Sequence, residues 1–149
     1  MTGGLALRPP GAADRAAWDR LWQGYQCFYK VEIPGPVSDL TWARLHDPAE
    51  PMTAMLAWHG ERAVGLVHWI FHRSTWTEGH YCYLQDLYVD EDLRGGGVGR
   101  ALIAHVRAEA EAAGCSRLYW LTHETNTDAM ALYDKVADKS GFVQYRVAL

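Results

Sequence analysis

Four closely spaced glycines form the stretch of the chain best suited to binding a ligand. They are Gly95, Gly96, Gly97 and Gly99, and they are flanked by Arg94 and Arg100. Glycine lets a backbone approach a ligand closely because it has no Cβ. The residues that follow carry apolar side chains at helical spacing. The first N–H groups of a helix have no partner within the helix and favour an anion. The sequence therefore predicts a site for a phosphate or pyrophosphate group.

The spacing of these residues argues against two common nucleotide-binding loops. A P-loop needs Lys followed by Ser or Thr after its last glycine, and neither dipeptide directly follows these glycines. The dinucleotide fingerprint would need a third glycine where Leu102 stands. The pattern present is Arg94-x-x-Gly97-x-Gly99 after an apolar stretch. It resembles the acetyl-CoA loop of the GCN5-related N-acetyltransferases (the GNAT family).

A second motif lies downstream at the distance that the same family shows. It reads N-x-x-A-x-x-L-Y and runs from Asn126 to Tyr133. The resemblance extends from about Met52 to Phe142. Within the family, the run from Tyr83 to Asp90 is similar to a small branch that includes fungal histone, polyamine and D-amino-acid acetyltransferases. The resemblance implies an α/β fold, a mixed central sheet flanked by helices, in a single N-acetyltransferase domain spanning residues 1–149.

The resemblance also implies where acetyl-CoA, the cosubstrate, is held. The residues that it places at acetyl-CoA are Leu87, Tyr88, Val89, Arg94, Gly95, Gly96, Gly97, Val98, Gly99, Arg100 and Asn126. Backbone groups of Leu87 and Val89 are expected to bind the pantetheine arm as an added strand would. Amides from Gly95 to Arg100 are expected to hold the pyrophosphate. Tyr133 matches the tyrosine that protonates the departing thiolate in many members.

The sequence offers several candidates for the group that takes the proton from the amine, because this chain departs from its relatives at the position of their glutamate. Gln85 stands where they carry a glutamate, and an amide cannot act as a base, although it can hold a water. Asp86 follows directly, and strand alternation would send it to the opposite face unless a bulge intervenes. Glu32, His123 and Glu124 are the other candidates. We take Asp86 as the expected catalytic carboxylate.

The expected reaction is acetyl transfer from acetyl-CoA to a primary amine of a small molecule by direct attack in a ternary complex. A polyamine, a diamine or an amino acid is the expected acceptor. The residues expected to contact it are Tyr29, Glu32, Gln85, Tyr119 and Trp120. Two alternatives remain open: acetylation of a protein or histone lysine, and a non-catalytic acyl-CoA-binding sensor that would keep the glycine loop without needing Tyr133.

Hydrophobic periodicity predicts the elements that carry these residues. Strands are expected at residues 5–8, 52–59, 62–72, from 81 through the run ending near 90, at 117–122 and at 142–148. Helices are expected at residues 15–26, from Ser38 or Asp39 to Leu45, from Val98 to about Ala113, and from Asp128 to about Lys139. Asp14 is a candidate cap for the first helix. The aromatic stripe of that helix, from Trp18 to Tyr25, is interpreted as core rather than as a ligand site.

Composition narrows the remaining possibilities. The formal net charge of −4 gives no support to nucleic-acid binding, and no apolar run is long enough to span a membrane. Three cysteines without a C-x-x-C pair argue against a disulfide framework and suit a reducing compartment, so we expect a cytoplasmic protein. The seven histidines lack metal-site spacing, and no metal is expected. The seven tryptophans favour a homodimer, because aromatic residues are enriched at interfaces.

Overall fold

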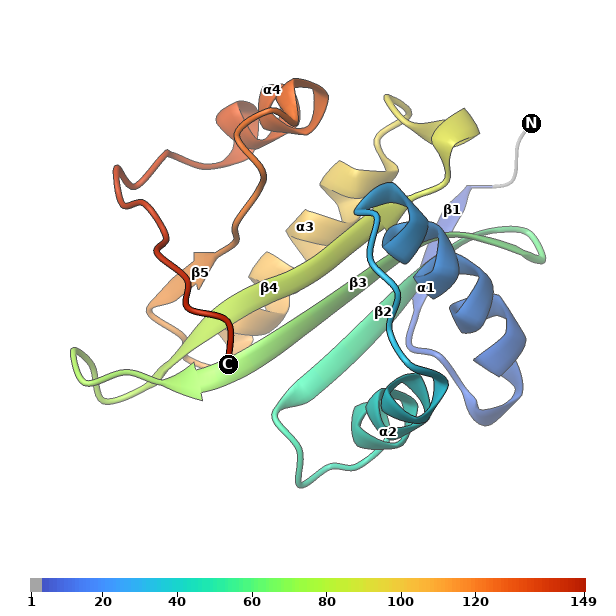
Figure 1. Ribbon diagram of the computed structural model, residues 1–149, viewed down its shortest axis with the longest axis horizontal. Helices are drawn as coiled ribbons and strands as arrows, with labels where there is room; N and C mark the ends of the chain where they lie inside the picture. The colour runs from blue at the N-terminus through green and yellow to red at the C-terminus, as the bar shows by residue number, and fades with distance from the viewer. Residues whose placement is uncertain (1–3) are drawn as a thin grey trace.

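The computed structural model describes residues 4–149 and shows one five-stranded mixed sheet with helices on both faces (Figure 1). The strands are β1 (Leu5–Arg8), β2 (Met52–His59), β3 (Arg62–Arg73), β4 (His80–Val89) and β5 (Arg117–Tyr119), paired in that order. The helices are α1 (Arg15–Phe28), α2 (Gly35–Leu45), α3 (Val98–Ala112) and α4 (Thr127–Val136), with short 3-10 turns η1 (Ala12–Asp14) and η2 (Glu91–Leu93). β1 to β4 are antiparallel and β5 is parallel to β4, which confirms the expected α/β architecture.

The apolar side chains of the sheet alternate between two cores, one on each face. Helices α1 and α2 lie over the front face in Figure 1, and α3 lies behind it. On the α1 side, Trp18 and Leu21 pack with Leu66. On the α3 side, Val67 packs with Val106, because successive strand residues point to opposite faces.

Helix α3 packs closely against the centre of the sheet at Gly65. A Cβ at that position would lie 2.9 Å from the Cγ1 atom of Val98, the first residue of α3. Any larger side chain would push the start of the helix away from β3. Gly65 therefore allows the start of α3 to lie close to the sheet, and this fixes how far the glycine loop lies from the sheet.

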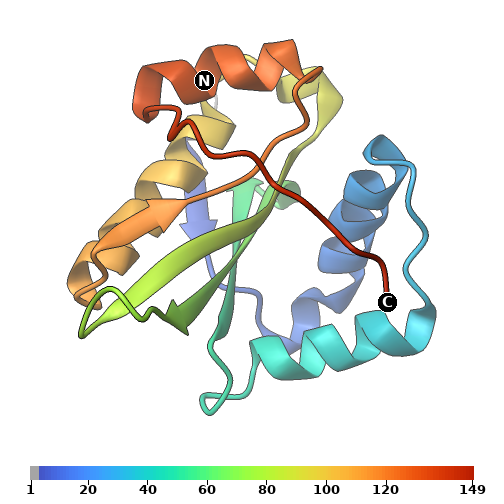
Figure 2. The ribbon, with the colours of Figure 1, turned by 60° about the vertical axis from the view of Figure 1, so that its left-hand side comes forward.

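Strand β5 pairs with the first part of β4 only, and beyond it the two segments of chain separate (Figure 2). The paired residues are Tyr81 with Arg117, Cys82 with Leu118 and Tyr83 with Tyr119. Further along, the Asp90 amide donates to the Val64 carbonyl oxygen on β3. Because backbone groups alternate along a strand, those of Leu87 and Val89 point to the other side, where residues 4–149 supply no strand. The second half of β4 thus has an open edge.

The expected last strand at residues 142–148 is wrong. The segment carries no ladder, and most of its apolar side chains are exposed, with Tyr145 at 94% and Phe142 at 77%. Its β-prone sequence is not sufficient, because a strand also needs a free edge alongside. β5 ends at Tyr119 rather than at Thr122, so it offers a short edge in this region.

One boundary of α2, one boundary of α4 and the capping of α1 also differ from expectation. Helix α2 begins at Gly35 instead of Ser38 or Asp39, because Pro36 stands in its first turn, where a proline is tolerated. Asp14 does stand at the N-cap of α1, but its Oδ2 atom accepts from the Gly11 amide (2.7 Å) and not from the helix. Helix α4 ends at Val136, three residues before Lys139.

Two further expectations concern the whole chain. The three cysteines, Cys27, Cys82 and Cys115, are all free thiols. Among the helices of residues 4–149, none combines the length and the apolar character that a membrane crossing requires.

Candidate active site

The glycine loop adopts backbone conformations that explain its composition. Gly95 and Gly97 have φ values of 83° and 89°, in the left-handed region that side chains with a Cβ rarely enter. Gly97 is the N-cap of α3, and the first helical hydrogen bond runs from the Ala101 amide to the Gly97 carbonyl oxygen (3.0 Å). The amides of Val98 to Arg100 therefore precede that bond and have no partner within the helix. These amides lie where the sequence predicts an anion site.

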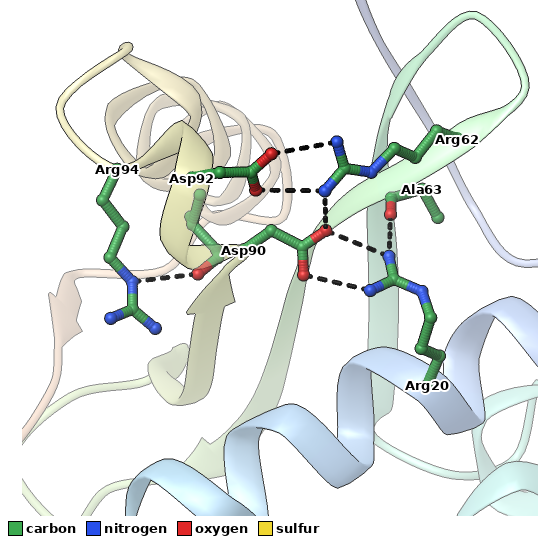
Figure 3. Close-up of polar contacts among 7 residues, drawn as sticks. Arg20, Arg62, Ala63, Asp90, Asp92 and Arg94 are labelled. Carbon is green, nitrogen blue, oxygen red and sulfur yellow. Dashed lines mark hydrogen bonds and ion pairs between the residues drawn. The ribbon is translucent and has the colours of Figure 1, made fainter.

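A network of ion pairs fixes the end of β4 just before this loop (Figure 3). The buried carboxylate of Asp90 accepts from Arg20 of α1 (3.1 and 3.2 Å) and from Arg62 of β3 (3.1 Å). Arg20 also donates to the carbonyl oxygen of Ala63. Arg62 donates to Asp92 as well, and this hydrogen bond lowers the pKa of the Asp92 carboxyl. Three elements therefore meet at the entrance to the loop.

The two arginines that flank the glycines lie in different surroundings. The Arg94 Nε atom donates to the Val89 carbonyl oxygen (3.0 Å; Figure 3). Its guanidinium carbon lies 5.0 Å from the centre of the Phe28 ring. Arg94 therefore binds one backbone acceptor on the open edge of β4. Arg100 is exposed and makes no hydrogen bond or ion pair with the rest of residues 4–149.

A β-bulge in β4 brings Gln85 and Asp86 to one cavity. Asp86 pairs with His68 and Leu84 pairs with Trp69, so Gln85 has no partner on β3. A bulge places two residues opposite one and re-aims their side chains. Both Gln85 and Asp86 line a cavity of about 440 Å³ between the sheet, α1 and α2. The bulge that would bring Gln85 and Asp86 to one face, named as an alternative from the sequence, is thus present.

Most of the cavity wall is apolar. It includes Trp22, Tyr25, Val31, Ile33, Leu45 and Met52. The polar lining residues are Thr41, His68, Gln85 and Asp86. The aromatic stripe of α1 was expected to be core only; Trp18 and Leu21 are core, whereas Trp22 and Tyr25 also form the wall.

Asp86 is held by a chain of buried hydrogen bonds. The Trp18 indole Nε1–H donates to the Nε2 atom of His68 (3.0 Å), and the Nδ1 atom of His68 lies 3.0 Å from Oδ2 of Asp86. An indole N–H can only donate, so Nε2 accepts and the ring proton sits on Nδ1. His68 is therefore neutral and donates to the carboxylate. Tyr25 is a second neighbour of this carboxylate, and a side-chain hydrogen bond with Asp86 is one cause of the raised pKa of Tyr25.

Tyrosines surround this carboxylate. Burial, followed by the negative charge of Asp86, raises the pKa of Tyr25, Tyr29 and Tyr83. Burial, with a smaller contribution from Tyr29, raises the pKa of Tyr133 to about 12. Tyr29 thus lies close enough to influence Tyr133 and to be influenced by Asp86. The hydroxyl groups of these tyrosines are protonated at neutral pH.

The other expected site residues lie around α4 and β5. The Trp120 ring packs edge-on against Tyr133 at 5.5 Å between centres. The Tyr119 hydroxyl hydrogen-bonds to His72 (2.7 Å), and its ring stacks on Tyr83. Asn126 is the N-cap of α4, but its side chain makes no capping hydrogen bond. Tyr119 and Trp120 are not among the residues that line the cavity.

The alternative bases are not brought to the cavity. Glu32 and Glu124 are exposed, and the Nδ1 atom of His123 interacts with the amide and hydroxyl of Thr125. None of the three lines the cavity. Within residues 4–149, no group of three or more His, Cys, Asp or Glu side chains is arranged to hold a metal ion.

Sequence reasoning missed His68 and Trp18 as parts of the site. In the sequence, His68 is one of seven histidines without metal-site spacing, and Trp18 belongs to the aromatic stripe interpreted as core. A histidine inside an apolar strand, facing a helix rich in tryptophan, is the signal that was available. It could not be used without knowing that β3, β4 and α1 meet.

Comparison with known proteins gives a consistent result. The model of the acetyltransferase (GNAT) family matches residues 18–137. The D-amino-acid N-acetyltransferase HPA3 of Saccharomyces cerevisiae is 39% identical over 135 residues, covering 89% of this chain and 84% of that protein. The thialysine N-epsilon-acetyltransferase of Bos taurus is 37% identical over 89 residues, but the match spans only 48% of that protein and 60% of this chain.

Solved structures share the fold. The structure of AAC(6')-Iy in complex with a CoA-containing bisubstrate analogue superposes with a TM-score of 0.85 over 99% of both chains, at 15% identity. At that identity the similarity concerns the arrangement of the elements. It includes the sheet and the helices that carry the glycine loop and the cavity.

Proposed function

The chain belongs to the acetyltransferase (GNAT) family and is an acetyl-CoA-dependent N-acetyltransferase, and from that premise we propose that it acetylates a small-molecule primary amine bound beside Asp86. The main support for this proposal is the bulge in β4. It directs the side chains of Gln85 and Asp86 toward the same cavity, next to the open edge of β4. The D-amino acid and the thialysine in the names of two relatives are small amines, which supports this acceptor class.

The proposed acetyl-CoA site fits the groups that the chain presents. The unpaired amides of Val98 to Arg100 suit the pyrophosphate. The backbone groups of Leu87 and Val89 on the open edge suit the amides of the pantetheine arm, which would lie along β4 as a strand does. Because Arg94 already occupies the Val89 carbonyl oxygen, the Leu87 groups and the Val89 amide are the free members of this edge.

The proposed chemistry uses two side chains, Asp86 and Tyr133. The amine nitrogen attacks the thioester carbonyl, and a backbone N–H near Leu87 stabilises the oxyanion. Asp86 accepts the proton of the amine, directly or through a water held by Gln85. The C–S bond then breaks, and Tyr133 donates its proton to the thiolate. A raised pKa of about 12 keeps that proton available.

Thiol release measures this function directly. Pure protein with acetyl-CoA is expected to release free thiol when a small primary amine is added, and to release none with the matching tertiary amine, which cannot form an amide. Release independent of any amine, or no release despite a broad panel of primary amines, would contradict the proposal.

The glycine loop gives a second prediction. Replacing Gly97 with alanine forces a Cβ into a φ of 89°, which costs about 1–2 kcal/mol. The dissociation constant of acetyl-CoA, measured by calorimetry, is expected to rise roughly tenfold. Gly114, with a φ of 77° at the far end of α3, is the matched control. An equal loss of affinity in Gly114→Ala would show that general strain, and not the loop, is responsible.

We also propose that the protein forms a homodimer and acts in the cytoplasm. The exposed apolar side chains of residues 142–147 would be covered by a second copy. The three free thiols are compatible with a reducing compartment. Sedimentation at micromolar concentration tests the dimer, and a profile of monomers alone would contradict it.

A further inference from the structure

We infer that the acceptor carries a single positive charge on an apolar, aromatic body. This inference deepens the proposed function and rests on it, because it assigns the cavity beside Asp86 to the acceptor amine. The shared chemistry is one ammonium group next to an aromatic ring. It can come from a free arylalkylamine, or from an aromatic amino acid whose carboxylate stays in solvent, because the lining residues include no lysine or arginine.

The charge of the cavity favours a single cation. Asp86 is the only carboxylate among its lining residues, which include no lysine or arginine. His68 is neutral, because its Nε2 atom accepts from the Trp18 indole and its Nδ1 atom donates to Asp86. Val31 and Ile33 line the cavity, but Glu32, which lies between them in the sequence, is exposed and does not line it. One ammonium group is thus matched, by Asp86.

A second ammonium group would have no partner in this cavity. The other lining residues are mainly apolar, among them Leu45, Met52 and Ile70. A charged group taken out of water without a counter-charge is strongly disfavoured. A polyamine or diamine would therefore bind only with its second charge left in solvent, and it would lose contact with the wall.

The wall also offers aromatic surface to the acceptor. The rings of Trp22 and Tyr25 stack at 5.0 Å between centres with an angle of 13°. Both line the cavity. An aromatic ring gains from such neighbours beyond its area alone. A volume of about 440 Å³ lies in the range of small-ligand pockets and has room for a ring on a short alkyl amine.

Two pairs of acceptors isolate the body of the amine. Phenylethylamine is compared with putrescine, and D-phenylalanine with D-lysine, so that each pair differs in whether the body is aromatic or bears a second ammonium. In each pair the aromatic member is expected to have a kcat/KM about tenfold higher or more. The ratio of kcat/KM between phenylethylamine and D-phenylalanine then shows whether the preferred acceptor is a free arylalkylamine or an aromatic amino acid.

A variant at the rim tests the charge argument within this cavity. Val31 lines it but is 48% exposed, so a substitution there should not disturb the fold. Val31→Glu adds a second carboxylate, and it is expected to raise the putrescine-to-phenylethylamine ratio of kcat/KM by up to about fivefold. Val31→Gln, of the same size without charge, is expected to leave the ratio near its original value.

The outcomes separate the two levels of the proposal. Equal or better turnover of putrescine and D-lysine would overturn the acceptor class while acetyl transfer stands. An unchanged ratio in Val31→Glu would overturn the assignment of this cavity to the acceptor. No thiol release with any of the four amines, together with unchanged acetyl-CoA binding, would overturn the acceptor class and the proposed function together.

Discussion

Asp86→Asn is expected to lower kcat by about 10²–10⁴-fold, the range of a lost general base. The amide keeps the size of the carboxylate and an oxygen that can accept from His68, so the buried hydrogen-bond chain from Trp18 can persist. An amide cannot take the proton of the amine. The loss should therefore appear in kcat, with the dissociation constant of acetyl-CoA unchanged.

The bulge supplies the control for this variant. Gln85 lines the same cavity as Asp86, so Asp86→Asn combined with Gln85→Glu places a carboxylate one residue away. Partial recovery of kcat in the double variant would show that a base is what the site lacks. If Asp86→Asn instead turns over normally at saturating amine, Asp86 only positions His68 and the base lies elsewhere.

Tyr133→Phe is expected to reduce kcat roughly 10²-fold or more, because the thiolate would leave without a proton donor. Phenylalanine retains the ring that packs on Trp120 at 5.5 Å, so the fold should be little affected. Tyr145→Phe removes the same hydroxyl from a tyrosine that is 94% exposed, and it should have no effect on turnover.

The pH profile of the Tyr133 variant provides an independent measurement. Burial raises the pKa of Tyr133 to about 12, so the folded enzyme keeps this proton from neutral pH to well above 10 and loses it only near 12. The deficit of Tyr133→Phe should therefore be constant between pH 6 and about 10. A deficit that disappears as the pH rises toward 9 would contradict the role of an acid with this pKa.

Local sequence signals were sufficient for the elements that carry the glycine loop. The turn before Val98 contains glycines at the positions where φ is positive, and the apolar spacing of α3 matches its buried side. The boundaries of β2 followed equally well from its sequence. These features depend on residues that are neighbours in the chain, and a sequence displays such neighbours directly.

The remaining features depend on residues far apart in the chain. His68 gains its role only because α1 and β4 meet it, at Trp18 and Asp86. The segment 142–148 has the composition of a strand, but the availability of an edge decides its structure, and that edge belongs to another part of the molecule. The bulge at Gln85 was foreseen as an option, although only the register with β3 could establish it.

The open edge of β4 has a consequence for the behaviour of the protein in solution. A row of unpaired backbone groups on a strand is a template for edge-to-edge association and aggregation. A cosubstrate lying along Leu87 and Val89 would cover that row, so acetyl-CoA would act as a solubilising agent for the enzyme that consumes it. We expect light scattering on mild heating to begin at a lower temperature without acetyl-CoA than with it. ADP, which offers a pyrophosphate but no pantetheine arm, should protect less.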